Sequence, residues 1–227
     1  MSRRFLIACV MTAWGAFLLW FAWTNTMARF LGPRTYWVAW FGAFGLLLAG
    51  VAGLRGAVRG GSAATLRDIG GAGLMVIPLI LVLVLPAPQL GAQAASRKAA
   101  GVGALSSFVP APSGGGDIGL KEIHYASLSA DYADTLGITD GLVVELTGFV
   151  THPDEAGEEF GLTRFYISCC AADAVPFTVI VRPSDTSAFS DDTWLTVEGE
   201  LVRSGSSFVL EATRITKAQE PSAPYLY

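Results

Sequence analysis

The chain has 227 residues, of which 52% are hydrophobic and only 15% are charged, and its mean hydropathy is +0.49. These values exclude an ordinary water-soluble domain and indicate membrane segments. The charge is unevenly divided, because residues 1–91 carry a net charge of +6 and residues 92–227 carry −10. The sequence therefore predicts a basic, apolar membrane region joined to an acidic, water-exposed domain.

Three apolar runs without charged residues lie in the membrane region (1–91), at residues 5–24, 36–54 and 70–88. Each is close to the ~20 residues that cross ~30 Å of hydrocarbon. Backbone in lipid must satisfy its own hydrogen bonds, so the runs predict three helices. Pro78 predicts a kink in the third, because proline lacks a donor and crowds the preceding turn. Helices without internal charge are expected to form an anchor and a docking surface, not a transport pathway.

The arginines of the membrane region predict its orientation. Five of them precede the first helix or lie between the second and third, and two lie between the first and second. By the positive-inside rule, the N-terminus is cytoplasmic and the C-terminal domain extracytoplasmic, in a multi-pass protein of the cell membrane. The first run could instead be a cleaved signal peptide, and Ala92-Gln93-Ala94 could be a later cleavage site. The first run is long for a signal peptide, so an intact anchor is the favoured prediction.

Residues 92–119 are rich in alanine, glycine, serine and proline and end in "PAPSGGGDIG". Such a composition cannot bury enough apolar surface to fold, so it predicts a flexible linker. Arg97 and Lys98, near its start, are expected to meet lipid head groups.

A third region, residues 120–227, has the pattern of a folded domain. A helix that ends at Gly137 is predicted by the helical spacing of Ile123, Leu128, Tyr132 and Leu136. Strand-like runs then follow at residues 142–150, 160–169, 176–183, 193–202 and 208–216. Gly148 predicts a bulge or bend in the first of them.

Five short strands in roughly ninety residues suit a small closed barrel. The predicted fold class is a membrane α-helical N-terminal part followed by an all-β C-terminal domain, a five-stranded OB-like barrel. An SH3-like barrel or a small sandwich is the alternative, since the number of strands does not fix their order.

The chain has three cysteines, which are candidates for chemistry. Cys9 lies in the first apolar run, where it is expected to pack as a small apolar residue. Cys169 and Cys170 are adjacent in "RFYISCCAADAVPF", residues 164–177. Thiols outside the cytoplasm tend to oxidise, although a disulfide between neighbours closes a strained ring. Four roles stay open for the pair: packing, binding of a soft metal or metalloid, redox exchange, and lipidation.

Soft thiolates favour Cu(I), Zn(II) or As(III), so a thiophilic ion is the predicted ligand if the pair binds one. A closed zinc site needs four ligands, and Cys169 and Cys170 supply two. Neither histidine lies at a metal-ligand spacing from the pair. The candidates for the remaining ligands are His124, His152, Asp154, Glu155, Glu158, Glu159 and Asp173.

Four further residues are predicted to have structural roles. Arg164 and Asp173 lie at opposite ends of the cysteine motif, and we expect an ion pair between them that pins the turn. Phe165 and Trp194 are expected to be core aromatic residues.

Two classes of function are disfavoured. A charge of −10 on the C-terminal part would repel phosphates, so no nucleic-acid partner is expected. The sequence has no P-loop, G-x-S-x-G or H-E-x-x-H motif, and its two histidines form no catalytic pattern, so no enzyme is expected.

Several stretches resemble a bacterial family of predicted permease subunits, in which N-terminal membrane helices precede an OB-like domain of unknown function. The matching stretches are "VVELTGFV", "TRFYISCCAADAVPF", "WLTVEGELV" and "EPSAPYLY". The core from Arg164 to Ala174 is the most specific of them. The resemblance implies a partner, a multi-helix predicted permease similar to the organoarsenical and metalloid efflux class. It implies no catalytic residues.

The resulting prediction is an accessory subunit that contacts membrane lipid and a multi-helix permease. Its barrel would assist the permease, by gating the pore or by passing on a thiophilic ion through Cys169 and Cys170. The alternative is a stand-alone surface protein that uses the same pair for redox chemistry or metal sensing.

Overall fold

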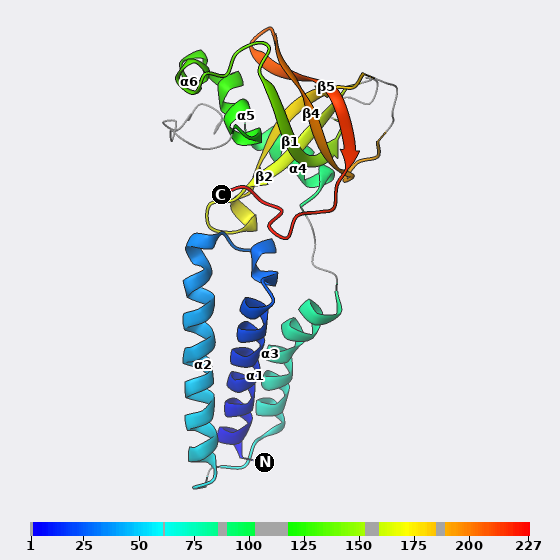
Figure 1. Ribbon diagram of the computed structural model, residues 1–227. Coiled ribbons are helices and arrows are strands. Elements are labelled where there is room, and N and C mark those ends of the chain that lie inside the picture. Colours follow the sequence, from blue (N-terminus) through cyan, green and yellow to red (C-terminus); the bar gives the residue numbers. More distant parts are fainter. Residues whose placement is uncertain (1, 61, 86–89, 103–117, 153–158, 185–188) are drawn as a thin grey trace. The chain divides into compact units, whose positions relative to one another are not determined.

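A computed structural model describes the chain except for residues 1, 61, 86–89, 103–117, 153–158 and 185–188 (Figure 1). The chain divides into two compact units, residues 1–89 and 90–227. The first is helical and the second contains a β-barrel.

The first unit holds three long helices, α1 (Arg3–Trp23), α2 (Tyr36–Ala57) and α3 (Leu66–Val84). Each is long and apolar enough to cross a membrane, which confirms the three predicted helices and makes this a membrane-associated protein. Two short 3₁₀ helices, η1 (Thr26–Arg29) and η2 (Pro33–Thr35), join α1 to α2. Helix α3 begins earlier than predicted, because Thr65 and Asp68 form a capping box ahead of the apolar run.

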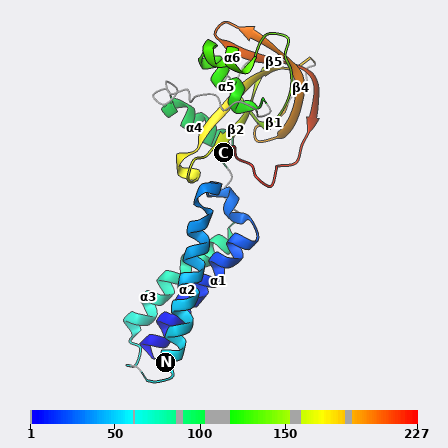
Figure 2. The same ribbon diagram turned by 60° about the vertical axis from the view of Figure 1, so that its left-hand side comes forward.

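Helix α1 packs against both α2 and α3 (Figure 2). The contact with α2 is close: a Cβ on Gly50 would lie 2.9 Å from the backbone nitrogen of Thr12. Only a glycine allows the two backbones to approach in this way. On the other side of α1, the Trp14 indole donates a hydrogen bond to the Met75 carbonyl of α3, at 3.0 Å.

The second unit is built around five strands that close into a barrel in the order β1-β2-β3-β5-β4, with β4 paired back to β1. Strands β3 and β5 are parallel and the other pairs antiparallel. This order confirms the predicted OB-like barrel. All five predicted strands are present, within three residues at each end: β1 (Val143–Thr151), β2 (Phe160–Tyr166), β3 (Val175–Arg182), β4 (Trp194–Ser204) and β5 (Ser207–Lys217).

Alternate residues of the strands fill the barrel, because successive side chains of a strand point to opposite faces. Two helices add to this core, α5 (Leu120–Leu128), which packs on β3 and β5, and α6 (Ala130–Leu136). The sequence predicted one helix here. The structure breaks it at Ser129, whose backbone is extended and whose hydroxyl accepts the Tyr132 N–H at 3.3 Å, so that Ser129 caps α6.

Helix α4 (Ala92–Val102) occupies the first part of the predicted flexible linker. The prediction failed over these residues because alanines supplied both the helix propensity and the packing surface. Ala92 and Ala95 are buried, and Asp192 accepts a hydrogen bond from the Ala92 N–H at 2.6 Å, which fixes the start of the helix. Residues 103–117 of that linker, including "PAPSGGG", lie outside the described residues.

Gly148 lies beside the point where β1 changes its partner from β4 to β2. A Cβ at Gly148 would lie 2.8 Å from the Thr163 carbonyl oxygen, so glycine allows the close approach of β2. The register shift that the structure describes is in the pairing of β4 with β5, where Glu198 pairs with Arg214 but Gly199 pairs with Ala212.

Candidate functional site

Cys169, Cys170 and Asp173 lie in the connection from β2 to β3, residues 167–174, which contains the 3₁₀ helix η3 (Ala171–Asp173). Both ends of this connection are anchored, because Ile167 and Ala174 are buried with Phe165 in a second apolar cluster of the unit. Between these anchors, Cys169 is exposed and Cys170 half-buried. The connection therefore presents its two thiols at the surface on a fixed base.

Asp173 holds the turn through backbone groups. One carboxylate oxygen accepts the Ser168 N–H at 3.1 Å and the other accepts the Cys169 N–H at 2.8 Å. The predicted ion pair between Arg164 and Asp173 is not what the structure shows. Arg164 donates instead to the carbonyls of Ala223 and Pro224, at 2.8 and 3.2 Å. Spacing along the motif could not distinguish a carboxylate partner from main-chain carbonyls far away in the sequence.

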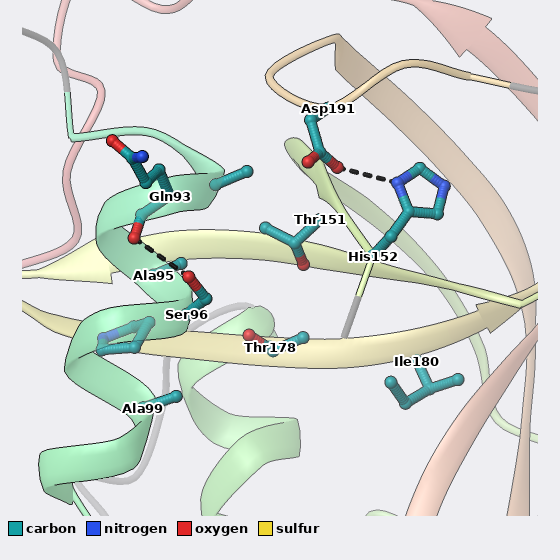
Figure 3. Close-up of a pocket in the computed structure, with 11 residues that line it drawn as sticks. Gln93, Ala95, Ser96, Ala99, Thr151, His152, Thr178, Ile180 and Asp191 are labelled. Carbon is teal, nitrogen blue, oxygen red and sulfur yellow. Dashed lines mark hydrogen bonds and ion pairs between the residues drawn. The ribbon is translucent and has the colours of Figure 1, made fainter. Parts of the chain in front are cut away.

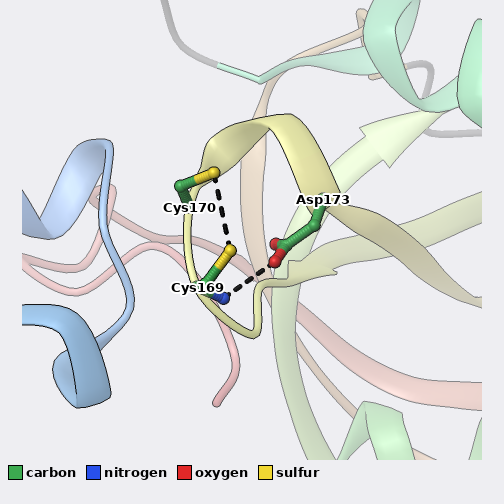
Figure 4. A group of neighbouring side chains, drawn as sticks. All are labelled: Cys169, Cys170 and Asp173. Carbon is green, nitrogen blue, oxygen red and sulfur yellow. Dashed lines mark hydrogen bonds between the residues drawn. The ribbon is translucent and has the colours of Figure 1, made fainter.

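The two thiols and the carboxylate form a compact group (Figure 4). The sulfur atoms are 3.7 Å apart, so they are not bonded to each other, and the ligand atoms of all three residues lie within 4.8 Å of one another. Two thiolates at the usual metal–sulfur distance of about 2.3 Å around a tetrahedral ion would be about 3.8 Å apart. The observed spacing therefore suits two sulfur ligands of one ion with little rearrangement.

Protonation of the group is set by Asp173. The hydrogen bond of the Cys169 thiol to that carboxylate, followed by its contact with Cys170, raises the pKa of Cys169 to about 11. Burial tends to raise the pKa of Asp173, but hydrogen bonds from the Cys169 thiol and nearby backbone N–H groups outweigh it and lower that pKa. At neutral pH the group thus holds a protonated Cys169 beside an ionised Asp173, and an ion bound by the thiolate must displace a proton.

The C-terminal segment supports the cysteine turn. Leu226 donates its N–H to the Phe165 carbonyl at 2.8 Å and accepts the Ile167 N–H at 3.1 Å, and Tyr225 is buried in the same apolar cluster. Desolvation lowers the pKa of the Arg164 guanidinium, which is engaged with this segment. The structure thus brings together the "RFYISCC" and "EPSAPYLY" stretches, which are far apart in the sequence.

Helix α4 supports the same turn from another direction. The Lys98 ammonium donates to the Ala172 carbonyl at 2.9 Å. Sequence reasoning placed Lys98 in a linker near lipid and so missed this contact. The run of helix-forming residues around it was the available signal.

The two aromatic residues predicted in the core occupy different environments. Phe165 is fully buried, in the second apolar cluster and not inside the barrel. Trp194 is half-buried at the edge of that cluster, with its ring 5.7 Å from Phe149 and beneath the Arg164 guanidinium at 5.9 Å. Both residues therefore pack around the base of the cysteine turn.

Neither histidine joins the cysteines in the group that could hold an ion. Burial lowers the pKa of His124, which lies against the Phe177 ring at 4.9 Å. His152 contacts the Asp191 carboxylate at 2.7 Å, and Glu159 pairs with Arg182. Of the other predicted ligands, Asp154, Glu155 and Glu158 lie outside the described residues.

A separate cavity of about 450 Å³ lies between α4 and the outer face of β1 and β3 (Figure 3). His152 and Asp191 line it, with Gln93 and Ser96 from α4. Thr151 and Thr178 line it too, and their hydroxyls join that of Thr163 in a chain of hydrogen bonds of 2.8–2.9 Å. These hydroxyls bond to one another, so they stabilise the sheet and offer little specificity for a ligand.

Comparison with known families decides the relationship of the chain. The model of the DUF1980 C-terminal domain matches residues 107–227, which is more than half of the chain. The chain belongs to this family. The matched residues contain the whole barrel, the cysteine turn and the C-terminal segment. No curated protein matches the chain.

Proposed function

We propose that this DUF1980 protein is a membrane-anchored accessory subunit of a transport system, and that its barrel binds a soft metal or metalloid ion as cargo for a partner permease. The observation that carries this proposal is the group of two thiols and one carboxylate within 4.8 Å. Three ligands are one fewer than a closed zinc site requires. An ion held this way keeps a position open for exchange, as delivery requires.

Metal binding is favoured over redox exchange at this pair. A thiol acts as a nucleophile through its thiolate, and reactive cysteines have a lowered pKa. Cys169 has its pKa raised to about 11 by Asp173 and Cys170. A soft cation would reverse this arrangement, because it replaces the proton and is attracted by the same carboxylate.

The helical unit supports a docking role. Its three helices could cross the bilayer, and the excess of arginines at one end favours a cytoplasmic N-terminus with the barrel outside. The family resemblance of the barrel motifs supplies the partner, a multi-helix permease. The proposal assigns no catalytic step and no nucleic-acid partner to the chain.

The decisive experiment replaces Cys169 and Cys170 by serine in cells that carry both the protein and its permease. We expect the double variant to lose bound Zn(II), Cu(I) or arsenite and to export the ion more slowly. The Cys9→Ser variant is the matched control, because it removes a thiol from α1 and leaves the turn intact. Loss of binding with unchanged export would favour a stand-alone sensor over a subunit.

Two further measurements test the anchor and the partner. A reporter enzyme fused behind Tyr227 should be active only on the outside of the cell. The tagged full-length chain in mild detergent should recover a multi-helix membrane protein. Activity of the reporter inside the cell, or recovery of the chain alone, would contradict the proposal.

A further inference from the structure

A cavity of about 710 Å³ lies between α1 and α3 within the helical unit and is lined by residues of both helices. We call it the α1–α3 groove. Its walls are apolar along about two helical turns, and two of its residues, Gly71 and Ala72, are small. The larger side chains that line it are Leu6, Ile7, Val10, Met11 and Met75. This composition suits a hydrocarbon chain.

One end of the groove is charged. Arg3 and Arg67 line it there together with Asp68. The Nε atom of Arg3 lies 3.2 Å from one Asp68 oxygen, and the other oxygen of Asp68 accepts hydrogen bonds from the Thr65 N–H and hydroxyl. The carboxylate is therefore occupied by its own helix cap and by one nitrogen of Arg3. A guanidinium has further N–H donors on its terminal nitrogens, so both arginines retain donors for a ligand.

The backbone adds to the positive potential at this end. Helices α1 and α3 begin side by side, because the Arg3 N–H donates to the Ser62 carbonyl at 3.0 Å just before the Thr65 cap. Two helix N-termini thus face the same surface, and each carries a partial positive charge. With Arg4 included, three arginines stand against one aspartate in these first turns.

The groove therefore combines a cationic mouth with an apolar channel, which is the chemistry of an anionic phospholipid. We propose that the α1–α3 groove binds one such lipid, with its phosphate at Arg3 and Arg67 and an acyl chain against Met11 and Met75. Basic pockets between membrane helices recognise lipid head groups in this way. The Trp14 indole, bonded to the Met75 carbonyl, joins the two helices beyond the groove and limits its length. This inference is independent of the metal site.

Native mass spectrometry of the delipidated full-length chain tests the proposal. The protein is mixed in detergent with equal amounts of phosphatidylglycerol, phosphatidylethanolamine and phosphatidylcholine. We expect one phosphatidylglycerol to be retained in preference to the zwitterionic lipids. The Arg3→Gln/Arg67→Gln variant should bind it about thirtyfold more weakly, from roughly fivefold for each arginine near an anionic head group.

Two comparison variants make the result specific. Arg55→Gln/Arg59→Gln removes the same charge from the end of α2 and the loop after it, outside the groove, and should keep the preference. Gly71→Leu fills the groove without removing a charge, and a Cβ at Gly71 meets nothing within 4 Å, so this variant should lose the retained lipid. Equal retention of the three lipids, equal losses in both arginine pairs, or unchanged binding in Gly71→Leu would each overturn the proposal. The proposal would also be overturned if these substitutions weakened binding of the permease and left lipid binding unchanged, because the groove would then hold a protein helix.

Discussion

The helical unit exposes many of its large apolar side chains at its surface, whereas the barrel unit buries them in its interior. On α2, Trp37, Phe41 and Leu48 are 66%, 76% and 72% exposed, whereas in the barrel Leu162 and Leu201 are completely buried. Water drives apolar groups inward, but hydrocarbon does not. The two units are therefore built for two solvents, and the cysteine turn belongs to the one built for water.

The largest difference is expected between the substitution of a leucine in the barrel and that of a leucine in the helical unit. Leu162→Ala removes a buried side chain from the barrel and should lower its free energy of unfolding by about 2–5 kcal/mol. Leu48→Ala removes an exposed one from α2 and should change stability by less than about 0.5 kcal/mol. Hydrogen exchange of β2 and α2 amides in the full-length protein measures both. Equal losses of stability in the two variants would contradict this difference between the two units.

The next effect concerns the reactivity of the cysteine turn. Asp173→Asn removes the carboxylate that contributes most to the raised pKa of Cys169, so that pKa should fall from about 11 toward 9.0. Each unit by which the pKa falls increases the thiolate fraction at pH 8 about tenfold. Alkylation of Cys169 should therefore accelerate by up to about a hundredfold. Asparagine keeps one acceptor oxygen, which can serve one of the two backbone N–H groups that Asp173 accepts. An unchanged alkylation rate would show that Asp173 does not control the thiol.

A smaller effect is expected at the C-terminal segment. Arg164→Gln removes charged hydrogen bonds to Ala223 and Pro224, each worth about 1.5–3 kcal/mol, and should increase hydrogen exchange at the amides of residues 223 and 225–227. Arg182→Gln is the control, because Arg182 pairs with two glutamates at the surface, where such pairs contribute about 0–1 kcal/mol. Similar exchange in the two variants would mean that Arg164 does not hold the segment.

The smallest effect is expected in the helical unit. Gly50→Ala places a Cβ 2.9 Å from the Thr12 nitrogen, and overpacking of this kind costs about 1–3 kcal/mol. Gly45→Ala, on the same helix, meets nothing within 4 Å and should be neutral. Thermal unfolding in detergent distinguishes them. If Gly45→Ala were the more damaging change, the packing of α1 on α2 would be incorrect.

The sequence predicted the regular parts of the fold because their signals are local. Hydropathy over about 20 residues locates α1, α2 and α3, and alternation locates all five strands. Helix α4 was missed because its buried residues are alanines such as Ala92 and Ala95, which carry little hydrophobic signal. The break at Ser129 was missed because a serine in a helical pattern is ambiguous until its hydroxyl is seen to cap α6.

Less of the candidate site could be predicted. The sequence located Cys169, Cys170 and Asp173 in one motif, and the structure places their ligand atoms together. It could not show that Arg164 binds main-chain carbonyls or that Lys98 reaches Ala172, because these partners are about 60 and 74 residues away. Long-range contacts to backbone groups leave no pattern in side-chain identity.

The most direct test of the account is a titration of the reduced full-length protein with Zn(II), Cu(I) or arsenite, followed by X-ray absorption of the bound ion. We expect one ion per chain, with two sulfur neighbours at about 2.3 Å if zinc is bound. The Cys9→Ser variant should bind equally well, and Cys169→Ser/Cys170→Ser should not bind. Equal binding by the double serine variant, or no binding by the unmodified protein, would show that the cysteine turn is not an ion site.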